Sequence, residues 1–156
     1  NINDLKASLR PGNIESLEVK QVQDFQINKF FYKQIGKKHR WIDRLTWSDQ
    51  NWKSYLNNKN VETFILKDKI DLIGFFERIY NYENNDFEIA YFGILEEYHK
   101  KGFGGYLLSH AIKDSFESFP NRVWLHTCSL DHKHAIKNYI SRGMKIFKEE
   151  KVKISA

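Results

Sequence analysis

The most constraining feature of the sequence is a glycine-rich turn, residues 99–105 (HKKGFGG), between a β-like run and an amphipathic helical pattern. The run before it, residues 87–94 (FEIAYFGI), is rich in the β-branched and aromatic residues that favour strands. After the turn, apolar residues recur at helical spacing from Phe103 to Phe116. The sequence therefore predicts a strand that passes through this turn directly into a helix.

The turn has the chemical features of an anion site. A helix N-terminus offers unpaired backbone N–H groups and the positive end of the helix dipole. Because Gly102, Gly104 and Gly105 carry no side chains, the backbone there can approach a phosphate closely. Lys100 and Lys101 add positive charge at the same place. We therefore expect the turn to hold a phosphate group.

Two familiar phosphate motifs do not fit this turn. Walker A requires G-x-x-x-x-G-K-[ST], and neither Lys nor Ser or Thr follows Gly104 and Gly105. The dinucleotide fingerprint G-x-G-x-x-G requires glycine where this chain has Leu107, and the strand before the turn is not the first of a βαβ repeat. The spacing thus excludes both motifs.

The turn resembles instead the acetyl-CoA loop of the GNAT N-acetyltransferases, [RQ]-x-x-G-x-[GA], in which a helix N-terminus holds the pyrophosphate of coenzyme A. His99 stands where the family usually has Arg or Gln, and Glu96 stands where it often has Pro. Gly102 and Gly104 match the two small positions of the motif.

A second segment, residues 131–144, is similar to the A-x-x-x-Y-x-x-x-G-F ending of the same family. Ala135, Tyr139 and Gly143 match that pattern, and Met144 replaces its Phe. His132 stands where the family often has Asn. The two segments occur in the family's order, with a β-like run over residues 122–127 between them.

This resemblance implies an α/β (α+β) fold with a central mixed β-sheet and helices on both faces. It also implies an acetyl-CoA-dependent N-acetyltransferase that acetylates a primary amine of a small molecule or peptide by direct attack. The residues expected to contact acetyl-CoA lie on the strand end, the turn and the second segment: Phe92, Gly93, Ile94, His99, Lys100, Lys101, Gly102, Phe103, Gly104, Gly105 and Asn138.

Two residues are candidates for proton transfer. Tyr139 matches the family tyrosine that protonates the departing thiolate, and the alternative is a core tyrosine bonded to backbone. Glu88 is the candidate base that takes a proton from the amine. The alternative is that Glu88 is only an ion-paired residue on a half-exposed strand and that a chain of water molecules is the base. Simple alternation puts Glu88 on one strand face with Ala90, Phe92 and Ile94. That apolar setting would raise a carboxylate pKa.

Aromatic residues are dense in the first half of the chain, and most of them are expected in the core. In the family this half forms the acceptor side, so Tyr32, Trp41 and Tyr91 are candidates for an apolar acceptor pocket. His126 is either a second base or a core histidine.

The pattern along the chain predicts a loose arm over residues 1–13 and a single domain over residues 14–156. A first strand is expected over residues 15–22, followed by a helix that Asp24 caps and Gly36 ends. Ser48 is expected to cap a second helix, with Trp47 and Trp52 as a hydrophobic staple. The whole order, β-α-α-β-β-β-α-β-α-β, predicts a mixed sheet with helices on both faces.

Composition limits the cellular location and the classes of function that are expected. The 156 residues contain no run of about 18 apolar residues, and no basic and then apolar leader, so neither a membrane span nor export is expected. The single Cys128 suits a reducing cytoplasm, and no Cys/His cluster predicts a metal. The net charge of +5 leaves a nucleic-acid-binding domain as an alternative. A coenzyme A-binding module without turnover is a further alternative, and either a monomer or a homodimer is compatible with the sequence.

Overall fold

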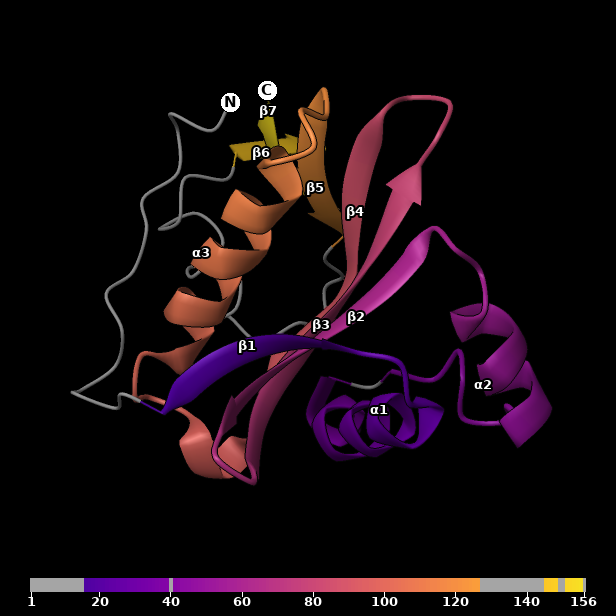
Figure 1. Cartoon of the computed structure of the whole chain (residues 1–156), viewed down its shortest axis with the longest axis vertical. Coiled ribbons are helices and arrows are strands. Elements are labelled where there is room, and N and C mark those ends of the chain that lie inside the picture. Colours follow the sequence, from indigo (N-terminus) through magenta and orange to yellow (C-terminus); the bar gives the residue numbers. More distant parts are fainter. Residues whose placement is uncertain (1–15, 40, 127–144, 149–150, 156) are drawn as a thin grey trace.

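The computed structural model describes residues 16–39, 41–126, 145–148 and 151–155. Its strands form one sheet in the order β1-β2-β3-β4-β5-β7-β6 (Figure 1). The strands are β1 (Leu17–Val22), β2 (Val61–Asp68), β3 (Asp71–Asn81), β4 (Asp86–Ile94), β5 (Arg122–His126), β6 (Lys145–Lys148) and β7 (Lys151–Ser155). Neighbours pair antiparallel except β4 and β5, which are parallel. The predicted mixed sheet is confirmed.

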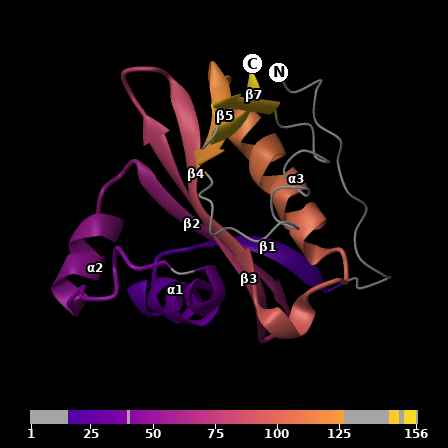
Figure 2. The ribbon, with the colours of Figure 1, turned by 180° about the vertical axis from the view of Figure 1, so that it is seen from behind.

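Helices cover both faces of this sheet, as predicted. Helices α1 (Phe25–His39) and α2 (Asp49–Leu56) lie on one face, and α3 (Phe103–Phe116) lies on the other (Figures 1 and 2). A short 3-10 turn, η2 (Glu96–Tyr98), precedes α3. The helix expected within residues 131–144 lies outside the described residues.

Each face of the sheet has its own apolar core. On one side, Leu107, Leu108 and Ile112 of α3 are fully buried against the sheet. On the other side, Phe31 of α1 stacks on Phe75 of β3 with ring centroids 4.9 Å apart. Burial of each such side chain contributes about 1.5–3 kcal/mol to the stability of the fold. The packing on the two sides therefore holds α3 and α1 on opposite faces of the sheet.

A β-bulge in β4 changes which of its side chains face α1 and which face α3. Glu77 pairs with Tyr91 and Arg78 pairs with Ile89, so Ala90 is an extra residue in β4. Beyond the bulge the alternation is shifted, and Tyr91 packs toward α1 while Phe92 packs toward α3.

The bulge overturns one expectation about Glu88. Phe87, Ile89 and Ile94 belong to the core under α3. Glu88 lies between Phe87 and Ile89 and therefore points to the opposite face, the face of α1 and α2. The prediction that Glu88 shares a face with Phe92 and Ile94 is wrong, because a bulge leaves no mark in simple alternation.

The segment that joins α1 to α2 confirms one predicted cap and corrects a predicted helix end. Ser48 caps α2 in a reciprocal capping box with Asn51, and the rings of Trp47 and Trp52 lie 4.9 Å apart. Gly36, however, does not end α1, which continues to His39. A Cβ at Gly36 would lie 3.1 Å from Cβ of Trp41, so this glycine makes room for the Trp41 side chain.

Gly93 offers a test of how closely α1 packs on β4. A Cβ at this position would lie 2.7 Å from Cγ2 and 2.8 Å from Cδ1 of Ile35. We expect Gly93→Ala to lower the free energy of unfolding by about 1–3 kcal/mol, measured by urea denaturation. In an Ile35→Ala background the same change should cost much less, and an equal cost in both backgrounds would show that the Ile35 contact is not the cause.

Candidate active site

The predicted glycine turn forms an open helix N-terminus. Gly102 is the N-cap of α3 with φ of 85°, a left-handed conformation that favours glycine. The first helical hydrogen bond is donated by the Tyr106 N–H to the Gly102 carbonyl, at 3.2 Å. The N–H groups of the preceding residues 103–105 therefore have no acceptor within the helix, and among the described residues no side chain caps Gly102. This arrangement suits an anion.

His99 fixes the turn to the end of β4. Its Nε2 lies 2.8 Å from the Ile94 carbonyl oxygen. Because a carbonyl only accepts, Nε2 is the protonated nitrogen in this contact. Lys100 and Lys101 follow it and are exposed, and Lys100 has a φ of 62°. The turn thus presents two ammonium groups to solvent beside the N-terminus of α3.

The parallel pairing of β4 and β5 ends before the predicted cofactor strand segment. The pairing covers Asp86 to Ile89 and stops at the bulge. Phe92, Gly93 and Ile94 continue in register with β3, beyond the end of that pairing in the described part of the chain. Their backbone therefore lies beyond the last described pair of β4 and β5, at the end of β4 that leads into the glycine turn.

Glu88 lies in a shallow hollow on the face of α1 and α2. Its register partners are Ile79 in β3 and Trp124 in β5. The hollow has a volume of about 360 Å³. It is lined by Asn58, Asn60, Ile79, Tyr80, Asn81, Tyr82, Glu83, Glu88 and Trp124. With two carboxylates, several amides and aromatic rings, this lining is suited to a ligand that carries positive charge.

The three aromatic residues predicted for the acceptor pocket do lie together. The ring of Tyr32 is 5.6 Å from the rings of both Trp41 and Tyr91, which are 4.9 Å apart. The space beside them is taken by the guanidinium of Arg44, 4.2 Å from the Tyr91 ring. Tyr32 is only 1% exposed. Tyr32 and Tyr91 of this group therefore lie beside an internal cation.

Arg44 and its partner Glu77 were missed by the sequence analysis. Nη1 of Arg44 lies 3.0 Å from each oxygen of the Glu77 carboxylate, and Glu77 has no exposed surface. Burial disfavours the charged guanidinium, but the charge and hydrogen bond of Glu77, together with Tyr55 and Tyr91, outweigh this effect and raise the pKa of Arg44. The burial of the nearby Tyr91 raises the pKa of its hydroxyl to about 12, so it stays protonated at neutral pH.

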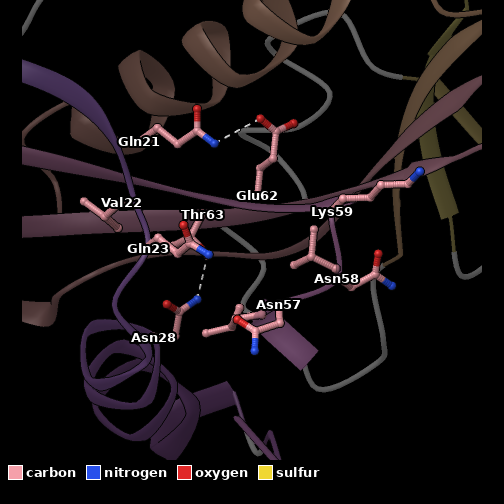
Figure 3. Close-up of a pocket in the computed structure, with 11 residues that line it drawn as sticks. Gln21, Val22, Gln23, Asn28, Asn57, Asn58, Lys59, Glu62 and Thr63 are labelled. Atoms are coloured by element: carbon pink, nitrogen blue, oxygen red, sulfur yellow. Dashed lines mark hydrogen bonds between the residues drawn. The ribbon is translucent and has the colours of Figure 1, made fainter. Parts of the chain in front are cut away.

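A second hollow, of about 470 Å³, lies between β1, the start of α1 and the start of β2 (Figure 3). Gln21 donates to Glu62 at 3.1 Å at its edge, and Asn28 donates to Thr63 at 2.8 Å. Its amide-rich lining offers donors and acceptors in similar measure and selects no single class of ligand.

Several predicted positions lie beyond what the structure describes. Tyr139 and Asn138 are outside the described residues. His126 is the last residue of β5, and its side chain is not described. Within the described ranges, no group of three or more His, Cys, Asp or Glu side chains could hold a metal ion.

Comparison with known proteins defines the class. Residues 22–144 match the acetyltransferase (GNAT) family, and the chain belongs to this family. It is accordingly an N-acetyltransferase by class. Comparison with curated proteins gives no significant match. In the part of the chain that the structure describes, no helix has the length and apolar character needed to cross a membrane.

Solved structures share the fold at low sequence identity. Spermidine N-acetyltransferase from Vibrio cholerae, in complex with CoA and spermine, is 19% identical with a TM-score of 0.72, covering 90% of this chain and 95% of its own. An aminoglycoside acetyltransferase from an uncultured soil metagenomic sample, in complex with trehalose, is 15% identical with a TM-score of 0.69. The match covers 86% of this chain and 91% of the aminoglycoside acetyltransferase. IAA acetyltransferase from Bacillus cereus is 16% identical with a TM-score of 0.63, and the match covers 85% of this chain and 79% of the Bacillus cereus chain.

Proposed function

We propose that the protein is a cytoplasmic enzyme that transfers the acetyl group of acetyl-CoA to a primary amine of a small cationic molecule or peptide. The observation that carries this proposal is the open N-terminus of α3, with three backbone N–H groups that have no helical acceptor, a short 3-10 turn after the end of β4. Family membership supports the acetyl group as the cargo.

The residues present fit acetyl-CoA. The N–H groups of Phe103, Gly104 and Gly105 would hold its pyrophosphate, with Lys100 and Lys101 adding charge. The backbone of residues 92–94 would pair with the pantetheine arm, and Asn138 would contribute from the second motif. When bound, the cofactor supplies the thioester carbonyl that the amine attacks.

The hollow beside Glu88 supports a cationic acceptor. A primary amine is protonated near neutral pH, and the carboxylates of Glu83 and Glu88 would attract it. The family neighbours named for spermidine and aminoglycosides have amine acceptors of this chemistry. Tyr82 and Trp124 offer ring faces to the remainder of such a molecule.

Two residues would carry the proton transfers of the proposed reaction. Glu88 would take a proton from the ammonium group, directly or through water, so that the amine nitrogen becomes nucleophilic. The nitrogen would then bond to the thioester carbonyl carbon as the carbon–sulfur bond breaks, and Tyr139 would donate its hydroxyl proton to the departing sulfur, which leaves as a thiol. The second proton of the newly bonded nitrogen would return to the Tyr139 phenolate through water, and Glu88 would release its proton to solvent. The lone Cys128 takes no part, because the amine attacks directly.

The proposal is tested by thiol release from acetyl-CoA with a panel of amines. The panel includes amino acids, di- and polyamines, an aminoglycoside and a peptide with a free N-terminus. We expect amine-dependent thiol release that is faster with multiply charged acceptors. Tight acetyl-CoA binding without thiol release for any amine would instead identify a coenzyme A-binding module.

The role of Glu88 as base predicts a change in pH dependence. A base must be deprotonated to act, so protonation of Glu88 would produce the acidic limb of the pH–rate profile. We expect Glu88→Gln to remove this limb and leave the basic limb in place. Glu83→Gln, in the same hollow, is the matched control and should keep both limbs. An unchanged acidic limb in Glu88→Gln would show that Glu88 is not the base, as expected if a water molecule held by backbone carbonyls takes the proton.

A further inference from the structure

The segment between α1 and α2 (residues 41–48) has one buried side chain, and it is charged. Arg44 is 5% exposed, whereas its apolar neighbours Ile42 and Leu45 are 68% and 60% exposed. A loop usually turns its apolar residues inward and leaves arginine in water. The segment is therefore held on the body of the protein by the contacts of Arg44 together with the packing of Trp41 and Trp47.

Arg44 contacts a carboxylate that is itself fixed. Glu77 on β3 accepts from Nη1 of Arg44 at 3.0 Å and from Nδ2 of Asn28 at 3.0 Å. Asn28 on α1 also donates to Thr63 on β2, as Figure 3 shows. The pair is thus anchored to α1, β2 and β3 by hydrogen bonds within the interior, where a carboxylate and a guanidinium need each other.

Aromatic rings from the surrounding elements enclose the guanidinium. Its carbon lies 4.2 Å from the ring centroids of Tyr55 and Tyr91, 4.7 Å from Trp47 and 5.3 Å from Trp52. Such positions over ring faces stabilise a cation, and arginine stacks in them better than lysine. The backbone N–H of Arg44 also donates to the hydroxyl of Tyr32 at 2.9 Å.

Tyr91 connects this arrangement to the active site. It is the register partner of Glu77, and it follows the bulge at Ala90. The next residues, Phe92 to Ile94, form the segment proposed to lie along acetyl-CoA. The guanidinium therefore ties the α1–α2 segment to the bulged part of β4, from the face on which Glu88 and its hollow lie.

We infer that Arg44 is a positioning residue, which with Glu77 fastens the α1–α2 segment against the bulge of β4 and so sets the acceptor side of the active site. This inference rests on the proposed function. It predicts that loosening Arg44 impairs use of the acceptor amine. The open N-terminus of α3 (residues 102–105, the phosphate cradle) lies on the other face of the sheet and should keep its affinity for acetyl-CoA.

A matched pair of variants separates positioning from stability. Arg78 is also buried, pairs with Glu62 and Asp114, and lies 4.8 and 4.7 Å from the rings of Phe64 and Phe87, in the core under α3. Arg44→Lys and Arg78→Lys both keep the positive charge but lose the planar guanidinium group and its paired N–H donors. We expect Arg44→Lys to raise the acceptor KM about tenfold and leave the acetyl-CoA Kd unchanged, with Arg78→Lys changing neither. An equal effect of the two variants on KM, or none from Arg44→Lys, would overturn the inference.

Chemical rescue supplies a readout that does not require turnover. In Arg44→Ala, millimolar guanidinium chloride should refill the space and restore the wild-type tryptophan emission, to which Trp47 and Trp52 contribute, whereas neutral urea should not. Failure of guanidinium to restore the emission would contradict the inference even if no amine is acetylated. If Arg44→Ala does not fold, the same emission is compared between Arg44→Lys and wild type, and an unchanged spectrum is the contradicting result. Absence of thiol release from wild type, in contrast, counts against the proposed function alone.

Discussion

Replacement of Tyr139 by phenylalanine is expected to lower kcat by about 10²–10⁴-fold, the usual contribution of a positioned proton donor. The phenylalanine ring fills the same space, so only the hydroxyl is lost. Without it the thiolate must leave unprotonated or take its proton from water. Steady-state kinetics with the preferred amine would measure kcat, and calorimetry should show an unchanged acetyl-CoA Kd.

The alternative for Tyr139 is a core tyrosine bonded to backbone, and it predicts a different outcome. Loss of a buried hydrogen bond would lower the melting temperature and leave turnover near normal. A variant that keeps more than about a third of the wild-type kcat would contradict the role in protonating the thiolate, since it lies well outside the range for a lost proton donor.

Gly104→Asp is expected to weaken acetyl-CoA binding by about 3–6 kcal/mol, a hundredfold or more in Kd. The new carboxylate would lie in the first turn of α3, where the pyrophosphate is proposed to bind, and would repel it. The helix itself should tolerate the change. Gly104 has no positive φ, and acidic residues are favourable near a helix N-terminus.

A neutral variant isolates the charge in this experiment. Gly104→Asn has nearly the same size as Gly104→Asp and should lose much less affinity, because it can donate a hydrogen bond to a phosphate oxygen. Thermal denaturation would confirm that both variants fold. An unchanged Kd in folded Gly104→Asp would contradict the assignment of the cradle.

Local features of this fold could be predicted because neighbouring residues decide them. The glycine turn followed by apolar helical spacing predicts a helix from Phe103, and α3 begins at that residue. The Ser48 cap and the Trp47–Trp52 contact likewise depend on side chains a few positions apart. The order of strands and helices was then sufficient for a mixed sheet covered on both faces.

Features decided by distant partners could not be predicted. The bulge at Ala90 depends on how β4 pairs with β3, and it changed the face assigned to Glu88. A glycine such as Gly36 usually marks the end of a helix, but here it is needed because a side chain at this position would meet Trp41. Arg44 lies in the segment between two helices, and its burial depends on Glu77, 33 positions later in the chain. No local pattern in the sequence joins these two residues.

Calorimetric titration of acetyl-CoA into the wild-type protein tests the central claim most directly. The account predicts saturable binding at one site per chain. Coenzyme A should compete for this site, because the phosphate cradle does not depend on the acetyl group. Absence of detectable binding at millimolar acetyl-CoA would contradict the cradle, the cofactor and the proposed reaction together.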